Sequence, residues 1–164
     1  MAVLTHKDAN QMTLANFDAL WDFNDPQATE TRFRELWAQA TDDAAYHAEL
    51  GTQIARTLGL QRRFDDAHHL LDQIERELPA DAPRPRIRYL LERGRVFNSS
   101  GKKEQARPLF ISAYELALQV GEDSYAVDAA HMVAIVETGE NVLAWNLKAL
   151  AQAESSTQEQ AQRW

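Results

Sequence analysis

Apolar side chains recur at intervals of three and four residues along most of this 164-residue chain, which is the spacing of one face of an α-helix. Phe33, Leu36, Trp37 and Ala40 form the first clear run. Only 6 Gly and 5 Pro interrupt the pattern, too few for the many tight turns of a sandwich or barrel. The periodicity therefore predicts an all-α protein in which short loops join successive helices.

Capping and turn signals divide this pattern into about seven to eight helices. Asp25 can accept a hydrogen bond from the first turn of a helix, and Pro26 suits the first helical position. Ser155 and Ser156 are expected to cap the last segment. The expected parts are a partly helical extension over 1–24, a repeat domain over 25–154 with a helix at 26–40 and hairpins at about 43–78, 84–119 and 123–154, and the start of a further, incomplete repeat helix over 155–164.

The hairpins share small and aromatic residues at matching offsets. In the middle hairpin, Leu90, Gly94 and Phe97 are followed by Ala106 and Phe110. This order resembles the tetratricopeptide repeat (TPR), whose first helix carries W-x2-L-G-x2-Y and whose second helix carries A-x3-F. One such hairpin cannot bury its own apolar face, so about three must stack. The resemblance implies a right-handed superhelical solenoid of stacked antiparallel helical hairpins.

The other two hairpins fit the same frame less completely. The first keeps Gly51 and Ala67 but has four extra residues between its halves, while the third keeps Ala144 and has Lys148 in place of the expected aromatic residue. The equivalent alanines are spaced by 39 residues and then by 38, the second interval running from Ala106 to Ala144. Because the family uses glycine where its two helices meet, we expect a close helix approach at Gly51.

In this family a concave groove, lined by the first helix of each repeat, holds an extended peptide or a partner helix. The residues that the repeat frame places in this groove, and that we expect to bind a partner, are Arg56, Arg88, Leu91, Arg95, Asn98 and Ser99. Arg88 and Arg95 lie seven residues apart on one helical face, so both guanidiniums can bind one carboxylate. Asn98 can donate to and accept from a peptide backbone. The implied partner is a protein or peptide segment of acidic character.

Two observations limit this interpretation. Arg88, Glu92 and Arg95 can instead form an ion network on the helix surface, worth roughly a few tenths of a kcal/mol. The carboxylate clamp of chaperone-binding members needs Lys and Asn in successive repeats, but Thr52 and Val133 stand where the first and third repeats would offer an amide. A chaperone C-terminus is therefore not the expected ligand.

The net charge of −8 is unevenly distributed. Residues 1–60 carry four Lys or Arg and nine Asp or Glu, residues 61–110 carry eleven and eight, and residues 111–164 carry two and eight. Acidic ends repel nucleic acid and anionic membranes, the basic centre lacks interleaved aromatic residues for base stacking, and no apolar run reaches the roughly 18 residues of a membrane span. We expect neither nucleic acid nor membrane as a partner. The chain has no cysteine, and its N-terminal MAVLTHKDANQ has no apolar core after its first charge, as a secretory signal would, which favours the cytoplasm.

The sequence contains no pattern typical of an enzyme, since it lacks G-x-S-x-G, a P-loop, H-E-x-x-H and a dinucleotide-binding glycine run. His68 and Asp72 share a helix face, but they would hold a metal only if further ligands converged, so a solvated histidine is the expected interpretation. His131, three residues after Asp128, is expected to be a packing residue. We therefore expect no catalytic residue, no cofactor and no metal site.

Together these patterns predict a non-enzymatic, scaffold-type protein–protein interaction module. The alternative is an oligomerisation or spacer fragment of a larger TPR-containing regulator, in which the open face of the C-terminal helix forms a homodimer contact. Trp37 and Trp145, at helical spacing, are expected to pack between helices. Trp164 would be exposed at the chain end unless the solenoid continues or dimerises.

Overall fold

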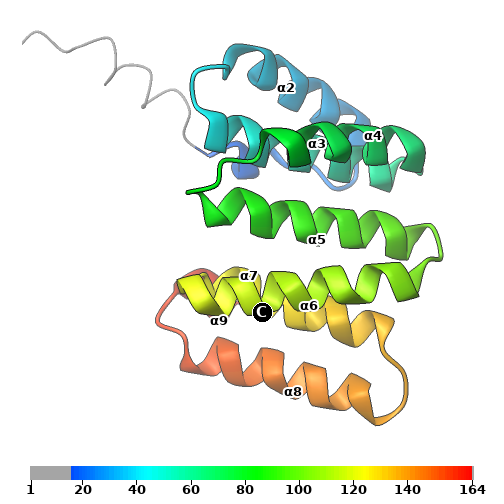
Figure 1. The fold of residues 1–164 in the computed structure, drawn as a ribbon, viewed down its shortest axis with the longest axis vertical. Helices are drawn as coiled ribbons and strands as arrows, with labels where there is room; N and C mark the ends of the chain where they lie inside the picture. Colours follow the sequence, from blue (N-terminus) through cyan, green and yellow to red (C-terminus); the bar gives the residue numbers. More distant parts are fainter. Residues whose placement is uncertain (1–15, 164) are drawn as a thin grey trace, which may run out of the picture.

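The structure is a computed structural model that describes residues 16–163. These residues form eight α-helices and one 3₁₀ helix, with no β-strand among them, so the all-α prediction is confirmed. The elements are η1 (Phe17–Leu20), α2 (Pro26–Gln39), α3 (Ala44–Leu60), α4 (Phe64–Glu77), α5 (Pro83–Ser99), α6 (Lys103–Val120), α7 (Asp123–Val136), α8 (Glu140–Ser155) and α9 (Glu159–Gln162). Figure 1 shows successive helices stacked along the longest axis of the molecule.

The starts of two helices follow from their capping residues. The Asp25 carboxylate accepts a hydrogen bond from the backbone N–H of Ala28 at 2.9 Å, and Pro26 is the first residue of α2, as predicted. Asp43 does the same for α3, accepting from the N–H of Tyr46 at 2.9 Å. The loops before α2 and α3 are therefore fixed by local sequence.

Two boundaries differ from the prediction. Helix α5 begins at Pro83 rather than near Pro85, because a proline at the first helical position gives up no hydrogen bond. The expected serine cap of the last segment is wrong. Helix α9 has Gln158 at its N-cap, and Ser156 instead donates a hydrogen bond to Asp123 at 2.7 Å, which ties the segment to the start of α7.

Consecutive helices pack against one another, and two glycines lie at close contacts between them. Helix α3 packs on α4, α5 on α6, and α7 on α8, while α3 also contacts α5 and α6 contacts α7. A Cβ atom at Gly94 would lie 2.4 Å from the ring of Phe110 in α6. At Gly51 it would lie 2.9 Å from Ile74 in α4, so the close approach predicted there is confirmed.

The pattern of buried residues in α8 differs from the one that the spacing of the equivalent alanines predicted. Ala67 and Ala106, the equivalent alanines of α4 and α6, are fully buried, but Ala144 is exposed. In α8 it is Trp145 and Ala149 that face the neighbouring helices. The spacing of 38 residues is therefore wrong for the last hairpin, and inward-facing positions recur every 39 residues, as from Ala106 to Trp145.

The apolar core has two main clusters that meet at α5. One runs from η1 to α5 around Phe17, Phe33 and Ile54, and the other runs from α5 to α7 around Phe110. The predicted packing role of two tryptophans is confirmed, since Trp37 packs on the first cluster and Trp145 lies edge-on to the ring of Tyr114 at 5.3 Å. The predictions for residues 1–15 and for Trp164 lie outside the described residues.

Candidate binding groove

All six predicted binding residues lie beside one another on two adjacent helices. Arg56 belongs to α3, and Arg88, Leu91, Arg95, Asn98 and Ser99 belong to α5. They line two adjoining hollows of about 300 and 180 Å³, whose linings share Arg56, Glu92 and Arg95. We call these two hollows the α5 groove. Residues of α7, Gln160 of α9 and residues of the 17–23 segment complete its walls.

Arg88 binds carboxylates of the chain itself. Its two terminal nitrogens donate to the two carboxylate oxygens of Asp18 at 2.6 and 2.9 Å, and one of them also donates to the hydroxyl of Tyr125 at 3.0 Å. Glu49 lies 3.4 Å away. Burial alone would lower the pKa of Arg88, but the hydrogen bonds and charges of these partners outweigh it and raise that pKa. Arg88 is only 6% exposed and stays charged.

Arg95 connects α5 to α7. One terminal nitrogen donates to both carboxylate oxygens of Asp128 at 2.6 Å, and the other donates to Glu92 at 2.6 Å. Burial would lower the pKa of Arg95, but the two carboxylates outweigh it and raise that pKa. Arg88 and Arg95, which were expected to share one carboxylate, are thus each bound to different ones. The Glu92–Arg95 pair that was expected as part of a surface network is largely shielded from solvent, since the side chains of Glu92 and Arg95 are 3% and 16% exposed.

Arg56 has weaker contacts to carboxylates than Arg88 and Arg95 have. Its guanidinium lies 3.7 Å from Glu92, too long for a hydrogen bond, and it makes no hydrogen bond within residues 16–163. It lies over the rings of Trp21 and Phe23, at 5.6 and 5.2 Å from their centroids. Burial, together with the nearby charge of Arg95, lowers the pKa of Arg56. Its N–H donors remain available to a ligand.

The other end of the groove offers neutral polar groups. Asn98 and Ser99 end α5 and line the hollow of about 180 Å³ together with Met132 of α7. Asn98 is half-buried, and its side-chain amide makes no hydrogen bond to any other described residue. Leu91 is fully buried and belongs to the apolar cluster beneath the groove. Asn98 therefore keeps the donor and the acceptor that the sequence assigned to it.

Two buried polar atoms beside the groove lack a partner among the described residues. They are Nε of Arg88, a donor, and Oε2 of Glu92, an acceptor. Buried polar groups are normally hydrogen-bonded, and leaving one unpaired costs about 1–3 kcal/mol. Two side chains that line the groove thus each keep one buried polar atom unpaired.

Sequence reasoning missed several residues of the groove. Asp128 was considered only as a neighbour of His131, although it is the main partner of Arg95. The 17–23 segment was treated as an extension, although it supplies Asp18, Trp21 and Phe23 to the lining. Its three aromatic residues within seven positions, with an aspartate beside each of them, were the available signal.

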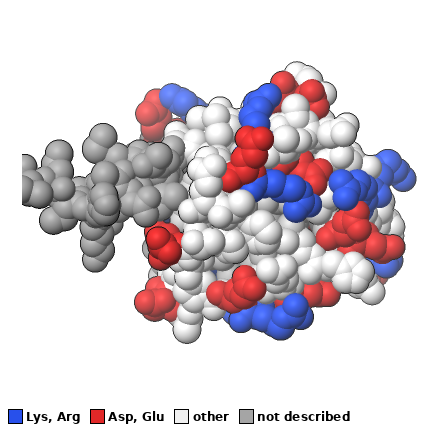
Figure 2. Space-filling model, turned by 90° about the horizontal axis from the view of Figure 1, so that it is seen from above, with Lys and Arg blue, Asp and Glu red and all other residues white. Residues whose placement is uncertain are grey.

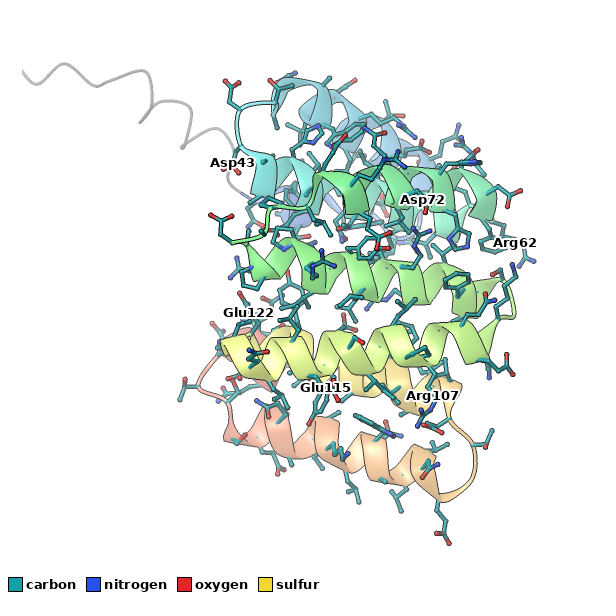
Figure 3. All side chains as sticks on the ribbon, in the orientation of Figure 1. Asp43, Arg62, Asp72, Arg107, Glu115 and Glu122 are labelled. Atoms are coloured by element: carbon teal, nitrogen blue, oxygen red, sulfur yellow. The ribbon has the colours of Figure 1, made fainter. Side chains whose placement is uncertain are left out.

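The other candidate cluster, around His68, is a set of polar contacts to an arginine. Arg93 of α5 donates to Nδ1 of His68 at 2.9 Å and also binds Asp72, which lies between α4 and α5 in Figure 3. Burial first, and then the charge of Arg93, lower the pKa of His68. Over residues 16–163, no three His, Asp or Glu side chains are grouped so that they would hold a metal ion.

Comparison of the chain with protein-family models, with curated proteins and with solved structures gives no match. Within the described part of the chain, none of the helices combines the length and the apolar character needed to cross a lipid bilayer.

Proposed function

We propose that this chain is a TPR-like helical-repeat module of the solenoid type, which binds a peptide or partner segment in the α5 groove and catalyses no reaction. The observation that carries the proposal is the position of the six residues that the repeat frame selected. Two neighbouring helices bring all six to the same pair of hollows. The glycine contacts at Gly51 and Gly94 further support the repeat assignment, since the family uses glycine at these offsets.

The charges of the groove favour an acidic partner. In the hollow of about 300 Å³, three cations, Arg56, Arg88 and Arg95, face three carboxylates, and one of these carboxylates, Asp18, comes from the 17–23 segment. A ligand carboxylate that takes the place of Asp18 would keep this balance and would meet guanidinium groups that bind such anions in bidentate geometry.

Nucleic acid is not the ligand that we propose, because most of the basic centre is neutralised by the chain itself. Arg84 pairs with Glu122 at 2.8 Å, and Arg93 pairs with Asp72. Figure 3 places Glu122 at the start of α7, beside α5. On the face shown in Figure 2, Lys and Arg side chains lie next to Asp and Glu, with no continuous basic patch.

A peptide-display selection on the full chain tests the proposal. We expect the enriched peptides to share an acidic residue, and we expect Arg56→Gln to weaken their binding about tenfold, since a hydrogen bond to a charged group contributes about 1.5–3 kcal/mol. Arg86→Gln is the matched control, because Arg86 is exposed on α5 outside the groove. Enriched peptides that bind both variants as tightly as the wild type would refute the proposal.

Self-association through α8 is the second candidate, and it rests on an exposed apolar stripe. Leu143, Leu147 and Leu150 are 64%, 54% and 53% exposed and follow helical spacing along one side of α8. We call these three leucines the α8 face. Sedimentation velocity across a concentration series tests this candidate, since a second copy on the α8 face predicts dimers that Leu147→Gln abolishes.

A further inference from the structure

The 17–23 segment lies in the α5 groove, although it is distant in sequence from the helices that form the walls. Asp18, Trp21 and Phe23 all line the hollow of about 300 Å³. Asp18 and Arg88, which are paired there, are 70 residues apart in the chain. The groove of this structure is therefore already partly filled by a short piece of the same chain.

The groove binds this segment through side chains, as it would bind a peptide ligand. Both oxygens of Asp18 accept hydrogen bonds from Arg88, which is the bidentate contact expected for a ligand carboxylate. The indole N–H of Trp21 donates to the side-chain carbonyl of Gln53 at 3.1 Å. The guanidinium carbon of Arg56 lies within cation–π distance of Trp21 and Phe23, at 5.6 and 5.2 Å from their ring centroids, and these two rings stack on each other at 4.6 Å.

The backbone of the segment is not attached to the walls of the groove. Its hydrogen bonds to helices reach only Thr29 and Arg32 of α2, and in the described chain none reaches α3, α5 or α7. Phe23 is 57% exposed and the side chain of Asp18 is 50% exposed. Phe17 is buried in the apolar core, and the ring of Trp21 packs against that core, edge-on to Phe33 at 5.3 Å. Release of residues 18–23 therefore breaks side-chain contacts, including that of Trp21 with Phe33, and the hydrogen bonds to α2, but no backbone hydrogen bond to the walls of the groove.

Asp18 also borders a third hollow. This hollow, of about 500 Å³, is lined by Arg84 and Glu49 and shares Asp18, Arg88 and Tyr125 with the groove. The side chain of Asp18 is 50% exposed there, so a ligand carboxylate that displaced it would meet the two terminal nitrogens of Arg88 that now bind Asp18.

From these contacts we infer that the 17–23 segment is a built-in competitor for the α5 groove. A partner must displace it, and the partner that fits best is a peptide with a carboxylate three residues before a bulky aromatic side chain, as in Asp18 and Trp21. This inference rests on the proposed function. It adds the chemistry of the partner and a cost for its binding, because a tethered segment competes at an effective concentration of about the millimolar range.

The test uses the full chain and a fluorescein-labelled synthetic peptide with the sequence of residues 16–24. Fluorescence anisotropy should show weak binding to the wild type and binding about tenfold tighter to Asp18→Asn, since that variant loses the charge-assisted bond that holds its own segment. Asp25→Asn is the matched control, because it makes the same charge change outside the groove and asparagine caps α2 equally well. Equal binding by wild type and Asp18→Asn would overturn the inference.

Hydrogen exchange on the same variants shows whether the segment releases on its own. In Asp18→Asn we expect faster exchange over residues 18–23 and unchanged exchange in α3 and α5. Faster exchange in those helices as well would mean that the segment is an integral part of the core, which would overturn the inference.

The two proposals fail in different ways. Display-selected acidic peptides that bind wild type and Asp18→Asn equally, and that still need Arg56, would support the proposed function. That result would refute the inference that the 17–23 segment competes for the groove. Selected peptides that bind neither chain in the α5 groove would remove the proposed function itself.

Discussion

The α5 groove and the α8 face are both open to solvent, yet they are built from opposite kinds of side chain. The groove is lined by arginines and carboxylates that are largely buried and held by hydrogen bonds of defined geometry. The α8 face consists of three leucines that are more than half exposed, and Lys148 is the one charged residue in the sequence between Leu143 and Leu150. The groove offers charged groups that bind in defined directions, whereas the α8 face offers apolar contact.

This difference indicates which surface can discriminate between partners. Burying paired charges costs desolvation free energy that their attraction scarcely recovers, so the network around Arg88 and Arg95 is weak evidence for stability. It does fix the position of donors and acceptors along α5. An exposed leucine row attracts any apolar surface, because the hydrophobic effect has no direction. Four predictions use this contrast, ordered by the size of the expected effect.

Arg95→Ala should be the most destabilising of these changes. It leaves Glu92 and Asp128 buried without their cation, and breaking a buried ion pair on one side costs about 3–5 kcal/mol. Urea unfolding followed by circular dichroism measures the loss. Arg86→Ala on the exposed side of α5 should change the free energy of unfolding by less than about 0.5 kcal/mol. A similar small effect at Arg95 would show that the groove charges are solvated.

Gly94→Ala tests the packing that places α5 beside α6. A methyl group there would meet the Phe110 ring at 2.4 Å, and such overpacking costs about 1–3 kcal/mol. Gly59→Ala is the control in α3, because its nearest neighbour, Val96, lies 3.5 Å away at ordinary contact distance. Thermal unfolding should show Gly94→Ala melting well below Gly59→Ala. Equal melting temperatures would contradict the close approach.

The contributions of Glu30 and Glu49 to the free energy of unfolding should change with pH in opposite directions. Burial would raise the pKa of Glu30, but hydrogen bonds from Gln61 and Arg34 outweigh it and lower that pKa, so Glu30 stabilises the fold above the usual glutamate pKa and loses this effect as pH falls. Burial raises the pKa of Glu49 despite Arg88, so its ionisation weakens the fold as pH rises from about 4.3.

Urea unfolding of the two glutamine variants at pH 7 and near pH 3.5 measures these signs. At pH 7, Glu30→Gln should lower the free energy of unfolding and Glu49→Gln should raise it, each by about 1 kcal/mol, the net contribution of a typical hydrogen bond. Both differences should shrink at the acid pH. The same sign for both variants would contradict the assigned environments.

Leu147→Gln should have the smallest effect on the monomer. The side chain is 54% exposed, so the free energy of unfolding should change by less than about 0.5 kcal/mol. Unfolding measured at low protein concentration isolates this term from any association. A loss of several times that size would mean that α8 packs more tightly than its exposure indicates.

Local sequence patterns predicted the helices, but they did not predict ion pairs between residues that are distant in the sequence. Caps such as Asp25 act within one turn, so they can be found in the sequence. The pairing of Arg95 with Asp128, 33 residues away, depends on how α5 and α7 meet. The last hairpin was shifted by one residue because Ala144 and Trp145 both suit an inward position, and only the packing against Tyr114 selects Trp145.

An NMR titration of the ¹⁵N-labelled Asp18→Asn chain with the peptide of residues 16–24 tests the central claim most directly. If the α5 groove is the binding surface, the shifted amide signals should come from α3 and α5, including those of Gln53, Arg56 and Asn98. Shifts confined to α8, or no shifts at peptide concentrations in the millimolar range, would contradict it.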